Sequence, residues 1–209
     1  MRFKDRADGG RKLVSPLEKY KNNKDAIVIG LPRGGVVTAY EVAKELNLKL
    51  DIIVVRKIGA PMQPELALGA ITQEGDILLD EKLMNMVGAT KEDLQPIIEE
   101  EKKEAQRRLS VYRGDKPPLD LKNKIVILVD DGLATGATMR AAIISARKLH
   151  AFKIIVAIPV SPPDTLKKIE KEADEVICLD APEPFWGVGA FYDSFFQTED
   201  EEVIAWLSK

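Results

Sequence analysis

The chain has 209 residues, of which 45% are hydrophobic and 31% charged, and its formal net charge is −3. This balance is typical of a folded α/β domain and excludes a disordered chain, and we expect one domain over residues 1–209. Basic and acidic residues are interspersed, so no basic stripe predicts a nucleic-acid surface. No apolar stretch approaches the roughly 20 residues of a membrane span, and residues 1–11 lack the apolar run of a secretory signal. With one cysteine, Cys178, no intramolecular disulfide is possible, and we expect a soluble, cytoplasmic protein without nucleic-acid or membrane partners.

Short apolar runs rich in β-branched residues predict buried strands. The strongest are 26–30, 51–55, 125–129 and 153–158, and the weaker ones are 76–79 and 175–179. Near-continuous apolar runs of this length are typical of parallel strands that are covered on both faces. Amphipathic helical patterns alternate with these runs, at 36–46 and 139–149. The alternation predicts an α/β fold with a Rossmann-like parallel sheet flanked by helices.

The segment 91–112 is densely charged, with a thin apolar line at helical spacing. It predicts a long helix in an insertion of about residues 82–114, which would form a helical lid. Arg107, Arg108 and Arg113 lie far along this insertion. They have the length to reach a site, but charged side chains on a helix are usually solvated, and we expect solvation here.

One stretch, residues 125–138, combines an apolar strand, two adjacent carboxylates and a loop of small and hydroxylated residues that opens a helix. Small residues let several backbone N–H groups converge on one point, and a helix N-terminus adds partial positive charge. These features predict a cradle for a phosphate monoester at the carboxyl end of a strand. The cradle consists of Ala134, Thr135, Gly136, Ala137 and Thr138.

The paired carboxylates of Asp130 and Asp131 narrow the class of ligand. They would repel a ligand that is only a phosphate, but ionised carboxylates accept hydrogen bonds from vicinal hydroxyls. The residues therefore predict a site for a ribose 5-phosphate. In the alternative, Asp130 caps the helix and Asp131 is solvated, which explains one carboxylate but not both together with the loop.

This order of strand, two acids, two variable positions and Thr/Gly/Thr loop resembles the signature of type I phosphoribosyltransferases, which bind 5-phosphoribosyl pyrophosphate (PRPP). The resemblance implies that Asp130 and Asp131 hold the ribose hydroxyls, that residues 134–138 wrap the 5′-phosphate, and that Mg²⁺ is bound with PRPP. It also implies a small hood built from about residues 1–20 and 181–209, and association into a homodimer. The layout is similar to a small prokaryotic group of this family whose acceptor is not defined.

PRPP also carries a pyrophosphate, which requires a second anion site. The loop 30–35 follows the first strand and opens a helix. Gly34 and Gly35 permit close backbone approach, and Arg33 can bind a pyrophosphate oxygen. The loop resembles the family's pyrophosphate loop; the alternative is an ordinary tight strand-to-helix turn.

Two cations, Arg56 and Lys57, follow the run 51–55. They resemble the family position that supplies a basic side chain to bind pyrophosphate, and that also starts a mobile loop. Residues 63–75 would then form part of the lid. The alternative is a pair of solvated surface cations.

The segment 181–196 is unusually rich in aromatic residues. In the family a hood of this kind recognises the base, so Phe185 and Trp186 are candidates for stacking on a planar acceptor. The alternative is that these rings pack the hood itself.

These observations predict a transferase that moves the 5-phosphoribosyl group from PRPP to a small nitrogen base, in nucleotide synthesis or salvage, and releases pyrophosphate. One alternative is a PRPP-binding regulator without catalysis, although no helix-turn-helix signal accompanies the domain. Another is a phosphosugar hydrolase whose two carboxylates hold a metal, but the extra ligands of such a site are missing.

Overall fold

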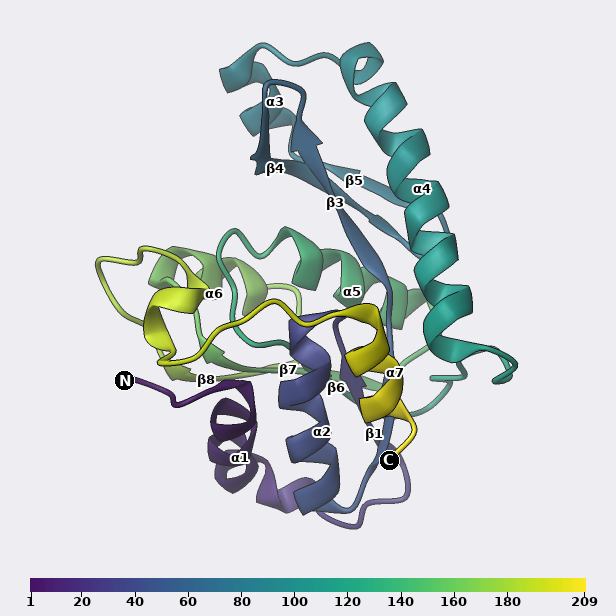
Figure 1. Cartoon of the computed structure of the whole chain (residues 1–209), viewed down its shortest axis with the longest axis vertical. Helices are drawn as coiled ribbons and strands as arrows, with labels where there is room; N and C mark the ends of the chain where they lie inside the picture. The colour runs from purple at the N-terminus through teal and green to yellow at the C-terminus, as the bar shows by residue number, and fades with distance from the viewer.

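The computed structural model describes residues 1–209, apart from the side chain of Glu65. Its centre is a five-stranded sheet in the order β2-β1-β6-β7-β8, and every neighbouring pair is parallel (Figure 1). The strands are β1 (Ala26–Gly30), β2 (Lys49–Ile52), β6 (Ile125–Val129), β7 (Lys153–Val160) and β8 (Glu175–Asp180). The α/β fold with a Rossmann-like parallel sheet is therefore confirmed.

Helices cover both faces of this sheet, which explains why its strands are apolar throughout. Ile127 and Val129 of β6 pack in one buried cluster with α1 and α2, whereas Val126 and Leu128 pack in another with α5 and α6. Figure 1 shows these two helix layers on opposite sides of the sheet. The four helices are α1 (Arg6–Leu17), α2 (Gly34–Leu46), α5 (Ala137–Lys148) and α6 (Pro163–Ile169).

The expected strand at residues 51–55 is wrong in its boundaries. Parallel pairing with β1 begins at Lys49 and ends at Ile52. The Val54 N–H then donates to the side-chain oxygen of Gln73, at 3.0 Å, instead of to a strand. The apolar run continues past the strand because Val54 packs in a buried cluster with α4 and α7.

Residues 55–113, here called the protruding unit, form a second layer above the sheet (Figure 1). The unit is an antiparallel sheet, β3-β4-β5, with two helices and its own core around Ile58, Leu68 and Leu94. Helices at 82–114 were expected and are present, and the segment after Arg56, expected to start a mobile loop, forms a β-hairpin. The run 76–79 contributes a strand to this small sheet and not to the main one. The elements are β3 (Val55–Ala60), β4 (Gln63–Thr72), β5 (Ile77–Leu79), α3 (Glu81–Val87) and α4 (Lys91–Arg113).

The two ends of the chain pack on different parts of the molecule. Phe3 pairs with Tyr192 in an isolated parallel bridge. The short helix η2 (Val188–Phe191) comes directly before Tyr192, and the short helix η1 (Glu18–Tyr20) follows α1. Helix α7 (Asp200–Leu207) packs through Val203 on residues of α2 and α4. Of the N-terminal hood segment, only the first few residues join the aromatic C-terminal stretch, because α1 lies in the helix layer against α2. Among the helices that the structure describes, none has the length and apolarity to span a membrane.

Close packing of α1 on α2 requires glycine at position 10. A Cβ atom there would collide with the carbonyl oxygen of Thr38 and lie 2.9 Å from Cβ of Glu41. We expect Gly10→Ala to lower the free energy of unfolding by roughly 1–3 kcal/mol, the usual cost of overpacking. Ser15→Ala, on the exposed side of α1, should change it by less than about 0.5 kcal/mol. Urea denaturation measures both, and equal stability of the two variants would contradict this packing.

Candidate functional site

Two strand-to-helix loops lie side by side at the carboxyl edge of the sheet. They follow the neighbouring strands β1 and β6, and the Leu31 N–H donates to the carbonyl of Val129 at 3.1 Å. A Cβ atom at Gly35 would lie 2.6 Å from a carboxylate oxygen of Asp130, and one at Gly34 would collide with Asp131. A side chain at position 34 would displace the ends of the Asp131 and Arg6 side chains, whereas one at position 35 would also lie 3.0 Å from the backbone Cα of Asp130. The first loop therefore rests directly on the two carboxylates.

The carboxylates of Asp130 and Asp131 lie largely out of solvent. The Asp131 N–H donates to Oδ1 of Asp130 at 2.9 Å, and the Asp131 side chain is 14% exposed. Burial raises the pKa of Asp130 well above its ordinary value, and the neighbouring charge of Asp131 raises it further. Burial also raises the pKa of Asp131, although the Arg6 guanidinium works against the rise.

Arg6 is a site residue that the sequence did not single out. Its Nε donates to Oδ2 of Asp131 at 2.6 Å, and its Nη1 donates to the carbonyl of Phe196 at 2.6 Å. The guanidinium also lies 3.8 Å from the ring centroid of Phe195. Arg6 thus joins the carboxylate pair to the aromatic segment. No local pattern could have found it, because 125 positions separate it from Asp131.

The tyrosine at position 192 fixes the backbone of the same carboxylate. Its hydroxyl donates to the carbonyl of Asp131 at 2.5 Å, and its ring packs on Phe3 with centroids 5.3 Å apart. Tyr192 is 4% exposed. The hood therefore holds the acidic loop through a buried hydrogen bond as well as through Arg6.

The small-residue loop after the carboxylates has the geometry of an anion cradle. Gly136 adopts a left-handed conformation, with φ 78°, and α5 begins at the next residue. The Thr165 hydroxyl of α6 donates to the carbonyl of Ala134 at 2.7 Å and anchors the loop from behind. The first N–H groups of α5 have no intrahelical acceptor, so they can bind an anion. Ala134 and Thr135 are exposed.

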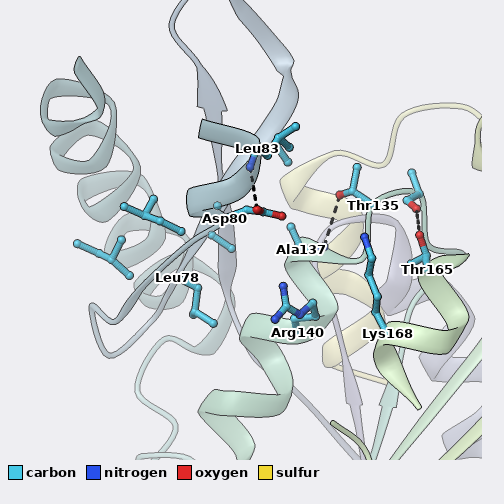
Figure 2. Close-up of a pocket in the computed structure, with 14 residues that line it drawn as sticks. Leu78, Asp80, Leu83, Thr135, Ala137, Arg140, Thr165 and Lys168 are labelled. Atoms are coloured by element: carbon cyan, nitrogen blue, oxygen red, sulfur yellow. Dashed lines mark hydrogen bonds between the residues drawn. The ribbon is translucent and has the colours of Figure 1, made fainter. Parts of the chain in front are cut away.

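A cavity of about 580 Å³ lies between this loop and the protruding unit (Figure 2). The loop contributes Ala134, Thr135 and Ala137 to its lining. Cationic side chains from α5 and α6, Arg140 and Lys168, also line it.

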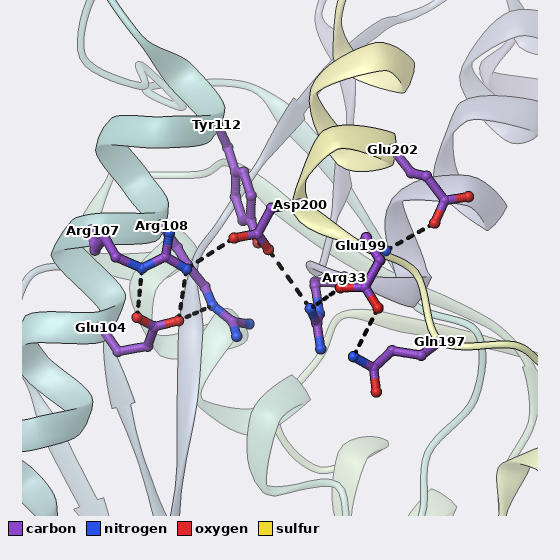
Figure 3. A network of polar contacts seen from close by, with 9 residues as sticks. All are labelled: Arg33, Glu104, Arg107, Arg108, Tyr112, Gln197, Glu199, Asp200 and Glu202. Carbon is purple, nitrogen blue, oxygen red and sulfur yellow. Dashed lines mark hydrogen bonds and ion pairs between the residues drawn. The ribbon is translucent and has the colours of Figure 1, made fainter.

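Arg33, expected to bind pyrophosphate, takes part in an ion-pair network with α4 and α7 (Figure 3). Its Nη1 lies 3.2 Å from a carboxylate oxygen of Glu199 and 3.8 Å from one of Asp200. Asp200 also accepts from Arg107, at 2.9 Å, and from the Tyr112 hydroxyl, at 2.5 Å. The carboxylates of α7 therefore compete with any anion for Arg33.

The expectation of solvated arginines on α4 is correct only in part. Arg107 and Arg108 both donate to Glu104, at 2.7 Å, and hold the pKa of Glu104 down to about 2. Arg108 is 13% exposed, and Arg113 is 10% exposed and paired with Asp51 at 3.0 Å. The two pairs with Glu104 lie within α4, whereas the pair of Arg113 with Asp51 attaches the end of α4 to β2.

The other expected pyrophosphate ligands lie in the protruding unit. Arg56, on β3, donates to Glu101 of α4 at 2.5 Å, and Lys57 follows it on the same strand. Of the predicted site residues, Gly34 and Gly35 lie in direct contact with Asp130 and Asp131. Arg56 does not share this contact, because its guanidinium is paired with Glu101 of α4.

The two aromatic candidates differ in their surroundings. Phe185 stacks on Phe191, with ring centroids 5.2 Å apart. This contact favours the alternative in which the ring of Phe185 packs the hood itself. Trp186 is 83% exposed and therefore open to solvent beside this cluster. Among the residues that the structure describes, no group of three or more His, Cys, Asp or Glu side chains is arranged to hold a metal ion.

Comparison with known proteins gives a consistent family. The model of the phosphoribosyl transferase domain matches residues 3–194. A Mycobacterium tuberculosis protein named "Putative phosphoribosyl transferase" is 42% identical over 207 residues, which are 99% of this chain and 46% of that protein. The structure of TT1426 from Thermus thermophilus has a TM-score of 0.78 and 38% identity, and the alignment covers 99% of this chain and 98% of that one. AQ2163 from Aquifex aeolicus, at 18% identity and a TM-score of 0.51, covering 82% and 71%, shares the fold alone.

The chain belongs to the phosphoribosyl transferase domain family, whose model spans most of its length. It is similar throughout to TT1426. It spans about half the length of the curated relatives that it matches.

The buried carboxylate pair predicts a pH-dependent cost in stability. Because folding raises the pKa of Asp130, its protonated form is favoured in the folded state, so stability falls as pH rises from the ordinary carboxyl range through the folded pKa. Asp130→Asn removes this cost and keeps an oxygen that can accept the Asp131 N–H. We expect roughly 0.5–2 kcal/mol of stabilisation at about pH 7 and little at about pH 3. Denaturant unfolding at both pH values measures it.

Asp164→Asn is the matched control, because that side chain is 87% exposed and should show no gain. An Asp130→Asn variant that is no more stable than wild type at neutral pH would contradict the claim that the charge on Asp130 lowers the stability of the fold.

Proposed function

We propose that this chain binds PRPP with Mg²⁺ and transfers its 5-phosphoribosyl group to a nitrogen base. The observation that carries the proposal is the direct contact between the two loops, with Gly34 and Gly35 resting on Asp130 and Asp131. Gly34 and Gly35 thus contact the acidic pair, and the cradle of residues 134–138 follows that pair directly in the sequence. A ribose with a phosphate at C5 and a pyrophosphate at C1 has this order of groups.

In the proposed complex Asp130 and Asp131 accept hydrogen bonds from the two ribose hydroxyls. Arg6 favours the ionised, accepting form of Asp131, against the effect of burial. The backbone N–H groups at the start of α5 bind the 5′-phosphate. Gly34 and Gly35 let the first loop approach the pyrophosphate closely, and Arg33 binds one of its oxygens after release from Glu199.

The reaction is a displacement at C1′. The lone pair of the acceptor nitrogen forms a bond to C1′ as the bond from C1′ to the pyrophosphate oxygen breaks, and its electrons leave with pyrophosphate. The acceptor nitrogen then loses its proton to solvent or to pyrophosphate. Such a reaction depends mainly on positioning and charge, so the site needs no general base of its own.

A magnesium ion fits the donors present. Asp130 and Asp131 offer neighbouring carboxylates beside Gly34 and Gly35 of the proposed pyrophosphate loop, and Mg²⁺ is commonly held by one or two carboxylates together with phosphate oxygens. When bound, the ion would neutralise charge on the pyrophosphate. The chain's own residues would orient the ribose and exclude water from one side of it.

Calorimetric titration of PRPP with Mg²⁺ tests the site. We expect wild type to bind, and Asp130→Asn/Asp131→Asn to weaken binding at least about a hundredfold, because two hydrogen bonds to charged groups are lost. The single variant Asp164→Asn is the control. Failure of folded wild-type protein to bind PRPP would overturn the proposal.

Turnover is measured separately, as pyrophosphate released with a panel of purine and pyrimidine bases. Release with one base identifies the acceptor. Binding without release from any base would favour the alternative of a PRPP-binding regulator and would contradict catalysis by this chain.

The competition for Arg33 gives a second prediction. Glu199 is 57% exposed, so its ion pair with Arg33 contributes at most about 1 kcal/mol. Glu199→Gln should therefore strengthen PRPP binding by up to about fivefold, whereas Arg33→Gln should weaken it. Glu201→Gln, an exposed change in the same turn, should have no effect. The role of Arg33 is contradicted if Arg33→Gln leaves the affinity unchanged in the same titration.

A further inference from the structure

The cavity beside the cradle of residues 134–138 is lined by side chains that the proposed reaction does not use. Its wall on the side of the protruding unit is small and apolar, and includes Ala67, Gly69 and Leu79. Ala67 adds only a methyl group to this wall, and at Gly69 the place of a side chain is taken by Leu78 and Leu79 of β5. The volume of about 580 Å³ is within the usual range for small-molecule sites.

The opposite wall is cationic. Arg140 lies on α5, one turn after Ala137, and Lys168 lies on α6 (Figure 2). Arg140 uses its Nε for an ion pair with Glu172, at 2.7 Å. Its two Nη groups have no hydrogen-bond partner in the part of the chain that the structure describes, so they can bind an anion. Among the residues that the structure describes, Lys168 has no carboxylate within ion-pair distance. Two cations and two threonines, Thr135 and Thr165, therefore line the same wall.

A single carboxylate, that of Asp80, faces these cations. One of its oxygens accepts the Leu83 N–H at 3.0 Å and caps α3. Figure 2 shows the carboxylate directed across the cavity toward Ala137. Its other oxygen can accept a hydrogen bond from an N–H group on a ligand.

We propose that this cavity is a second binding site, for a nucleoside monophosphate. Arg140 and Lys168 bind the phosphate, the base lies on the apolar wall of β4 and β5, and an N–H edge of the base donates to Asp80. A flat ring, an anion and a hydrogen-bond donor on one small molecule match the three kinds of surface that line the cavity. The ribose carboxylates Asp130 and Asp131 are not part of this site.

The site is coupled to the proposed PRPP site through one shared loop. Ala134, Thr135 and Ala137 line the cavity and also belong to the proposed cradle for the 5′-phosphate. Two phosphates beside the same loop repel each other, so each ligand weakens binding of the other by the same factor. This coupling rests on the proposed function, whereas binding in the cavity does not.

Titration calorimetry with guanosine 5′-monophosphate and adenosine 5′-monophosphate tests the site, with inorganic phosphate as a comparison. We expect wild type to bind at least one nucleotide more tightly than phosphate. Arg140→Ser/Lys168→Ser should weaken that binding at least about tenfold, the effect of one lost charged hydrogen bond. The control Arg147→Ser/Lys167→Ser removes an arginine and a lysine from the same two helices, outside the cavity, and should leave affinity unchanged.

The Asp130→Asn/Asp131→Asn variant separates this proposal from the proposed function. We expect it to lose PRPP and to keep the nucleotide, whereas Arg140→Ser/Lys168→Ser should keep PRPP. Nucleotide binding that is lost in the carboxylate variant would mean that the nucleotide occupies the ribose site, and would overturn the proposal. Unchanged nucleotide binding in Arg140→Ser/Lys168→Ser, or no nucleotide binding by wild type, would overturn it as well. Thermal unfolding of each variant confirms that it is folded.

Discussion

The contact between two glycines and two partly buried carboxylates determines the arrangement of the rest of the site. Gly34 and Gly35 allow the loop after β1 to rest on Asp130 and Asp131, with no space for a side chain between them. The adjacent strands β1 and β6 bring the loops together. Burial makes the carboxylate pair costly, so Arg6 compensates one of the two charges. Functional sites commonly lower the stability of the fold in this way.

The protruding unit contacts α7, and α7 in turn contacts the first loop through Arg33. Asp200 accepts from Arg107 and Tyr112 of α4 and lies 3.8 Å from Arg33 of the first loop. The position of Arg33 therefore depends on the C-terminal helix and on the protruding unit together. An anion that takes Arg33 away from α7 would also change what holds α4, which links ligand binding to the unit above the sheet.

The small antiparallel sheet has a different part in the structure. It has its own core, and one side of it faces the phosphate loop across a cavity with cations on the lower wall. The resemblance to the family implied a mobile loop after Arg56, with residues 63–75 as part of the lid. In the structure Pro61 lies in the turn between β3 and β4, and Pro64 lies near the start of β4. Gly59 lets the two strands approach, since a Cβ atom there would collide with the backbone of Pro64.

The sequence by itself determined the strands at 26–30 and 125–129, the α/β class and the order of carboxylates and small residues after β6. These features are local: an apolar run, a change of period and a short motif each lie within about 15 residues. The partners of Asp131 and Arg33 were decided only by tertiary structure, because Arg6 and Glu199 reach them from opposite ends of the chain. The end of β2 was likewise decided by packing, since Val54 stays buried after pairing with β1 has stopped. Hydrophobic pattern records burial, but neither the strand partner nor a distant ion pair leaves a periodic signal in the sequence.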